Sequence, residues 1–105
     1  MDNQQKALNL LGLATRARKL VSGTGIVLDT IRSKDASLVV LAKDASENTK
    51  KQFLNKCDYY HTPLIIDFSQ AELSSAIGRE RTVCAFTDDG FARSFKNCMS
   101  EKKGD

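Results

Sequence analysis

The sequence predicts an α/β fold, a three-layer α/β/α sandwich in which helices cover both faces of a small, about four-stranded mixed sheet. Segments with apolar residues at helical spacing alternate along the chain with short apolar runs of the strand type. The run at 37–42 is continuously apolar, as in a central strand that is covered on both faces. Of the 105 residues 41% are apolar and no linker or repeat is evident, so one domain over 1–105 is expected, frayed at about 1–4 and 101–105.

Two helix–strand pairs are expected in the first part of the chain, at residues 3–15, 19–22, 25–33 and 37–42. In the first helix, the apolar positions that recur at helical spacing are Ala7, Leu10, Leu11 and Ala14. In the second helix, one side is formed by Val27, Thr30 and Ile31. Each helix therefore has a side that can pack against a sheet.

Capping residues define the third and fourth helices. Residues 44–47 offer N-cap side chains and an acid for the first turn of a helix that reaches about Lys56. The residues expected to face inward from it are Phe53, Leu54 and Cys57. Further on, Ser69 and Glu72 form a capping-box pattern, and Gly78 is expected to end the helix that they begin.

Strands are expected on either side of this fourth helix, at residues 63–68 and 82–87. Asp88 or Asp89 can then cap a final helix. Its apolar side is formed by Phe91, Phe95, Cys98 and Met99. Ligands of such sheets bind at loops along one edge of the strands, so the candidate binding loops are 22–25, 43–46, 68–70 and 78–82.

Catalytic and metal-binding patterns are weak in this sequence. The three cysteines, Cys57, Cys84 and Cys98, lie far apart beside apolar residues, which favours buried inert thiols over a disulfide framework, a zinc site or a nucleophile. The single histidine, His61, precedes Pro63 and is interpreted as a surface or turn residue. No metal, no cofactor and no catalytic residue is therefore expected.

The chain is also expected to lie in the cytoplasm. No apolar run approaches the roughly 20 residues that a membrane helix needs. The polar N-terminus lacks the layout of a secretion signal.

Positive charge is concentrated in the first third of the chain, around residues 16–25. Residues 1–34 carry six Lys or Arg and two acids, in a chain with a net charge of +3. Arg16, Arg18 and Lys19 lead into Gly23-Thr-Gly25, where a new helix begins. The exposed N–H groups of a helix N-terminus can bind an anion, and glycine allows close approach. The alternative is a strand-to-helix turn with a solvated basic flank.

Other cations lie in the candidate loops. Lys43 follows a predicted strand, and Arg79 and Arg81 lie between a helix and a strand. Each of them alone is consistent with a solvated loop charge. If the loops share an edge, however, these cations flank a helix N-terminus and can hold RNA phosphates. The modest charge fits a limited phosphate footprint and does not fit the coating of DNA.

A dinucleotide-binding alternative rests on Gly23 and Gly25, which begin a Gly-x-Gly-x-x-Gly pattern, and on Asp44 as a ribose ligand. Leu28 occupies the third glycine position, and the preceding strand is very short. This alternative requires a cleft beside Gly23 and Asp44.

An ordered set of segments resembles a known family. They are residues 10–23 (LLGLATRARKLVSG), 38–46 (LVVLAKDAS), 56–60, Pro63, 72–78 and 87–91. Together they resemble the kink-turn RNA-binding ribosomal protein family of the L7Ae and L30e type, and within it the small bacterial members of the YlxQ type. The resemblance implies the α/β/α sandwich, no catalysis, and binding of a monomer to bent, structured RNA in a ribosome or translation setting. Translation factors are further expected partners, whereas DNA and membranes are not.

The resemblance also implies which residues touch RNA. The Gly23–Gly25 corner matches the element that approaches the paired bases beside the kink, and 78–82 matches a loop that packs on a flipped-out base. The expected RNA-binding residues are Arg16, Lys19, Gly23, Thr24, Gly25, Lys43, Arg79, Arg81 and Val83.

The sequence departs from the better-known members of this family after the glycine corner. Those members carry an Asn-Glu pair and, one turn later, a Lys; here Gly25, Ile26 and Asp29 stand in their places. Ser74 occupies a position in the fourth helix where those members usually have a glycine. A second alternative is therefore a protein-interaction module on the same fold. An exposed Ile26 would favour that alternative.

Overall fold

A computed structural model describes residues 2–103, in which five helices alternate with four strands. The elements are α1 (Asn3–Arg16), β1 (Leu20–Ser22), α2 (Thr24–Arg32), β2 (Leu38–Leu41), α3 (Glu47–Tyr60), β3 (Leu64–Ile66), α4 (Gln70–Ile77), β4 (Val83–Phe86) and α5 (Asp89–Lys103). Of the ends expected to fray, residues 1, 104 and 105 lie outside the described range.

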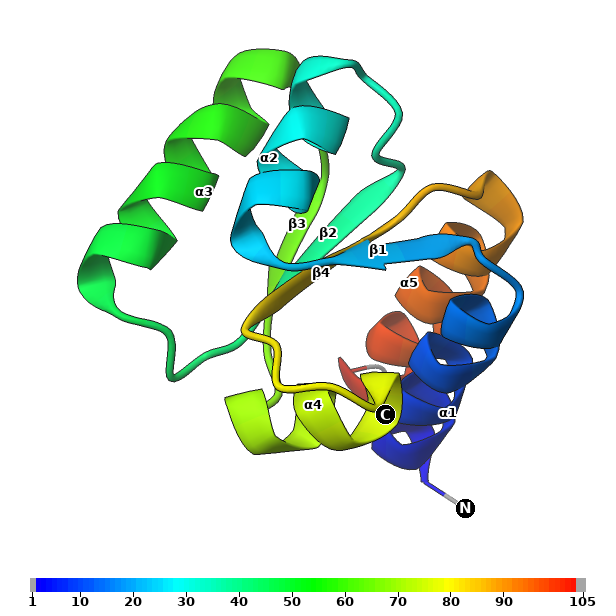
Figure 1. Cartoon of the computed structure of the whole chain (residues 1–105). Helices are drawn as coiled ribbons and strands as arrows, with labels where there is room; N and C mark the ends of the chain where they lie inside the picture. Colours follow the sequence, from blue (N-terminus) through cyan, green and yellow to red (C-terminus); the bar gives the residue numbers. More distant parts are fainter. Residues whose placement is uncertain (1, 104–105) are drawn as a thin grey trace.

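The four strands form one open, mixed sheet in the order β1-β4-β2-β3. Strand β4 runs antiparallel to both β1 and β2, whereas β3 runs parallel to β2. Helices α2 and α3 cover one face of the sheet, and α1, α4 and α5 cover the other (Figure 1). The predicted three-layer α/β/α sandwich is therefore confirmed.

Strands β2 and β4 supply the centre of the core, because every residue in both is buried. Successive side chains of a strand point to opposite faces. Thus Val40 and Cys84 pack with α1, α4 and α5, whereas Val39 and Ala85 pack with α2 and α3. This double burial explains why the run at 37–42 has no polar alternation.

Caps place the ends of α4 and the start of α5 close to their predicted positions, but α3 runs to Tyr60, past its predicted end at about Lys56, because the helix is closed only at His61. Ser69 and Glu72 form the complete capping box at the start of α4, and Gly78 ends that helix with φ 91°. Asp88 accepts a hydrogen bond from the N–H of Phe91 at the start of α5. His61 ends α3 in a left-handed conformation and is exposed, as expected of a turn histidine.

One packing prediction for the helices is wrong. Leu54 is 49% exposed, because α3 turns Phe53 and Cys57 toward the sheet and Leu54 lies about 100° around the helix from Phe53. In α2 Val27 and Ile31 are buried and Thr30 is half-buried on the predicted side, and Leu28 is buried beside them.

Candidate nucleic-acid interface

Four loops meet at one edge of the sheet. Strands β1, β2 and β3 end there and β4 begins there, because β4 is antiparallel to its neighbours. We call residues 22–25, 42–46, 67–70 and 78–82 the loop edge. Hydrogen bonds join these loops to one another: Ala42 N to Thr82 O (2.8 Å), Lys43 N to Phe68 O (2.8 Å), Gln70 N to Asp44 Oδ1 (2.8 Å) and Arg81 Nε to Ser22 Oγ (3.0 Å).

The N-terminus of α2 lies in the loop edge and differs from its neighbours. Ser46 and Ser69 cap α3 and α4 with their side chains, and each of those helices has a glutamate in its first turn. Within the described chain, α2 has neither a side-chain cap nor an acid in its first turn, because its N-cap is Gly23. Its first N–H groups and the positive end of its dipole therefore face solvent.

Gly23 is required by its backbone. Its φ of 101° and ψ of 142° lie in a region that is almost restricted to glycine. Its N–H donates to the carbonyl of Val83 (3.0 Å), and its carbonyl accepts from Val27 N (3.0 Å). Gly23 thus joins the end of β1 to both β4 and the first turn of α2.

Gly25 is not required by the fold in the same way. A Cβ added at this position would meet no atom within 4 Å. The missing side chain leaves an open surface over the first turn of α2, which a ligand can approach closely.

The side chain of Arg81 lies beside this helix start. A Cβ at Gly23 would lie 3.7 Å from Arg81 Nε, so the arginine passes close to the glycine. Arg81 Nε donates to Ser22 Oγ (3.0 Å), and Nη1 donates to the carbonyl of Glu80 (2.9 Å). A fixed cation therefore adds its charge to the positive end of the α2 dipole.

Two further predicted cations also belong to the loop edge. Lys43 and Arg79 are exposed there, one after β2 and the other between α4 and β4. Thr24 and Gly25, at the start of α2, are exposed as well. The structure therefore brings together most of the residues that the sequence assigned to RNA.

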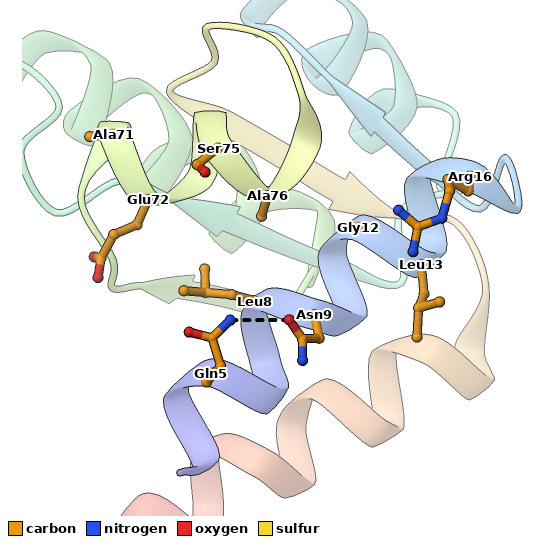
Figure 2. Close-up of a pocket in the computed structure, with 10 residues that line it drawn as sticks. All are labelled: Gln5, Leu8, Asn9, Gly12, Leu13, Arg16, Ala71, Glu72, Ser75 and Ala76. Carbon is orange, nitrogen blue, oxygen red and sulfur yellow. Dashed lines mark hydrogen bonds between the residues drawn. The ribbon is translucent and has the colours of Figure 1, made fainter. Parts of the chain in front are cut away.

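Arg16 and Lys19 are not part of this group. Lys19 precedes β1 and accepts a hydrogen bond from Thr87 N (2.9 Å), which places it at the opposite edge of the sheet. Arg16 lies in the last turn of α1, and its guanidinium turns back over Gly12 in the groove between α1 and α4 (Figure 2). The expectation that they approach the glycine corner was wrong, because β1 separates them from it.

The role given to Val83 is also corrected. Its side chain is fully buried among residues of α2 and α3, because it is the first residue of a strand covered on both faces. Only its carbonyl takes part in the loop edge, through the N–H of Gly23.

The dinucleotide alternative gains no support. A groove of about 800 Å³ lies between α1 and α4 (Figure 2), and a hollow of about 600 Å³ lies between β3 and α5. Gly23 and Asp44 line neither. Asp44 instead caps α4 through Gln70 N, and Leu28 is buried.

Ile26 and Asp29 lie in α2 beside the loop edge, where neither side chain is a hydrogen-bond donor. Ile26 is 57% exposed in the first turn of α2, which by the criterion stated above favours a protein partner. Asp29 pairs with Arg32 at 3.2 Å one turn on, so its charge is partly compensated on its own helix.

The cysteines have no chemical role that the structure supports. Cys57 and Cys84 are buried, Cys98 is partly buried, and all three are free. Burial raises the pKa of Cys57 to about 11 and that of Cys84 to about 12, so both remain protonated thiols at neutral pH. Among residues 2–103 no group of three or more His, Cys, Asp or Glu could hold a metal ion.

Ser22 in the loop edge and Ser74 in α4 both hold Arg81, but neither was predicted as a site residue. Ser74 contacts Arg81 from α4, and Ser22 contacts it from β1. Serine at a strand end or in a helix carries no distinctive sequence pattern, so only the tertiary contacts reveal the two residues.

No helix among the described residues is long and apolar enough to cross a membrane.

Sequence comparisons identify relatives over nearly the whole chain. Residues 5–95 match the model of the Ribosomal protein L7Ae/L30e/S12e/Gadd45 family. RNA-binding protein YlxQ of Enterococcus faecium is 47% identical over 97 residues, which are 92% of this chain and 94% of that protein. RNA-binding protein YlxQ of Bacillus subtilis is 52% identical over 84 residues, 79% of this chain and 84% of that protein.

Solved structures show the same fold. A protein of unknown function from Bacillus halodurans superimposes with a TM-score of 0.86 at 38% identity, covering 90% of this chain and 97% of that one. The Giardia lamblia 15.5kD RNA binding protein superimposes with a TM-score of 0.78 at 17% identity, covering 94% of this chain and 86% of that one.

The matched family and the two YlxQ relatives are non-enzymatic, which confirms the prediction that the chain is not an enzyme.

The two glycines should respond oppositely to alanine. We expect Gly23→Ala to lower the free energy of unfolding by about 1–3 kcal/mol, because alanine is strained at this φ and ψ. Gly25→Ala should leave it unchanged or raise it by up to about 1 kcal/mol, since the position is open and helical. Urea unfolding of both variants measures this, and equal losses would contradict the assignment.

Alkaline pH should destabilise the protein through its buried thiols. Above the ordinary thiol pKa of 9.0 the unfolded chain ionises Cys84, whereas the folded chain keeps it neutral up to about 12. Stability is therefore retained below pH 9 and falls above it, by about 1.4 kcal/mol per pH unit for this thiol. Urea unfolding between pH 8 and 10.5 tests this. Cys84→Ala should show a smaller slope, and an unchanged slope would contradict it.

Proposed function

This chain belongs to the Ribosomal protein L7Ae/L30e/S12e/Gadd45 family, and we propose that it binds structured RNA through the loop edge. The observation that carries the proposal is Arg81 held beside Gly23 at the uncapped start of α2. A helix N-terminus and a fixed guanidinium both favour a phosphate at the same place. The RNA-binding names of relatives at 47% and 52% identity support the same conclusion.

The proposed contacts divide into two kinds. Phosphate oxygens accept hydrogen bonds from the backbone N–H groups of Thr24 and Gly25 and from Nη2 of the Arg81 guanidinium. Lys43 and Arg79 supply further charge from the neighbouring loops. The open surface at Gly25 lets the first turn of α2 approach the RNA closely. Through these contacts the protein recognises the path of the RNA sugar–phosphate backbone more than the edges of the bases.

A bent RNA suits this arrangement better than a straight one. The cations lie on loops at one edge of a small sheet, so the footprint is narrow. A kink brings phosphates of two segments together, which lets one small surface contact both. We therefore propose a kink-turn RNA as the target, in the ribosome or in translation, with the protein acting as a monomer. The cytoplasm is the proposed setting because translation takes place there.

The protein-interaction alternative rests on Ile26. The side chain of Ile26 is 57% exposed beside the loop edge, so it can make an apolar contact. Phosphate groups do not provide a partner for such a contact, whereas a protein surface does. The cations and the uncapped helix start favour RNA, and the two proposals predict different selectivity for RNA shape.

The proposed function predicts selectivity for kinked RNA. A gel-shift assay with a standard kink-turn RNA and a straight duplex of equal length should show tighter binding to the kink-turn by about tenfold or more. Equal binding to the two RNAs would contradict the kink-turn proposal and would leave only binding by a basic patch without selectivity for shape. Binding to neither RNA would contradict RNA binding altogether and favour the protein-interaction alternative.

Salt dependence should locate the phosphate contacts. Arg81→Ala and Lys43→Ala should each reduce the slope of log K against log salt concentration by about one unit, because each removes one phosphate contact. Lys19→Ala is the matched control, since it removes the same charge at the opposite edge of the sheet. Filter binding between 50 and 200 mM salt measures the slopes. A loss of slope in Lys19→Ala alone would contradict this placement of the interface.

A further inference from the structure

Arg81 is held more firmly than a surface arginine needs to be. Ser74 Oγ accepts a hydrogen bond from Arg81 N (2.8 Å) and donates one to Arg81 O (3.1 Å). Ser22 Oγ accepts from Nε (3.0 Å), and the carbonyl of Glu80 accepts from Nη1 (2.9 Å). Hydrogen bonds therefore fix both the backbone and the side chain of this one residue.

We propose that Ser22 and Ser74 are positioning residues for RNA binding: the hydroxyl of Ser74 fixes the backbone of Arg81, and that of Ser22 orients its guanidinium. The proposal rests on the proposed function, because it assigns Arg81 to the RNA contact. The serines do not touch the RNA themselves. They act by fixing Arg81 before the RNA arrives.

The hydroxyl of Ser74 is directed away from its own helix. Thr15 and Thr30, which also lie in helices, donate to the carbonyl four residues earlier, as helical hydroxyls commonly do (2.7 and 2.8 Å). Ser74 instead donates to and accepts from Arg81, seven residues later and beyond the end of α4. This side chain clamps the loop at 78–82 onto the helix.

Ser22 reaches Arg81 from the same side of the sheet. Its neighbour Val21 packs with the α2–α3 core and Leu20 with the opposite core, so alternation turns Ser22 toward the α4 side. There it meets the Nε of an arginine that α4 already holds by its backbone. Two elements far apart in sequence thus hold the same residue, α4 by its backbone and β1 by its side chain.

The hydrogen bonds still leave the cation available. An arginine has five N–H donors, of which the described contacts engage the one on Nε and one on Nη1. Three N–H groups remain, one on Nη1 and two on Nη2, and they can donate charge-assisted hydrogen bonds to phosphate oxygens. Because the rotamer is already fixed, binding loses little side-chain entropy, and each hydroxyl should increase RNA affinity by about three- to tenfold.

A double-mutant cycle tests this in the full-length protein with the kink-turn RNA. Ser22→Ala and Ser74→Ala should each weaken binding by about three- to tenfold. In an Arg81→Ala background the same changes should have no further effect, because no guanidinium is left to hold. Ser22→Thr should retain binding, since its hydroxyl can accept from Nε. Ser75→Ala is the matched control, an exposed serine of the same helix, and should be unchanged.

A second measurement follows the guanidinium directly. In the free protein, the Nε proton of Arg81 should exchange slowly with water by NMR, and should exchange faster in Ser22→Ala but not in Ser75→Ala. This signal does not depend on RNA. It also keeps the test decisive if Ser74→Ala lowers the stability of the protein.

Several results would overturn the proposal. If the serine variants bind normally while Arg81→Ala binds weakly, the positioning role is wrong and the RNA interface stands. If the serine changes weaken binding equally with and without Arg81, their role is general stability. If Arg81→Ala binds normally, the positioning role is again wrong while RNA binding persists through other residues. If the wild-type protein binds no RNA, both proposals are wrong.

Discussion

Strand β4 pairs with both β1 and β2, and its residues are buried on the two faces of the sheet. Since it runs antiparallel to both neighbours, its beginning lies where they end. The loop that leads into β4 therefore meets the turn between β1 and α2. The carbonyl of Val83, the first residue of β4, accepts from Gly23 and fixes the start of α2. The interface depends on this central strand more than on any surface residue.

The loop edge combines structural and binding features at neighbouring helix ends. The N-termini of α3 and α4 are satisfied by serine caps and first-turn glutamates, so they contribute to stability and offer little to an anion. Asp44 adds a further acceptor at the start of α4. Of α2, α3 and α4, only α2 presents its positive end without a side-chain cap. The proposed anion contact is thereby confined to one place on an edge that also carries acids.

The RNA recognition proposed for this surface rests on shape more than on the reading of bases. Gly25 has no side chain, Ile26 has no hydrogen-bonding group, and Asp29 is paired with Arg32. None of them can donate a side-chain hydrogen bond to a base edge. What remains is a fixed arginine, the backbone N–H groups of a helix start and flanking cations, all of which suit phosphates. The exposed Ile26 adds an apolar contact for a base, a sugar or a partner protein.

The sequence by itself determined the layers of this protein and the capped ends of its helices, although not the end of α3. Apolar periodicity and capping are local properties, so the run at 37–42, the box formed by Ser69 and Glu72 and the turn at Gly23 could be recognised from neighbouring residues alone. Only the tertiary structure decided which cations share an edge. Strand pairing separated Lys19 from Gly23, buried Val83, and brought Ser22 and Ser74 to Arg81. Such contacts join residues distant in the chain, and their geometry is set by sheet order, which no local pattern encodes.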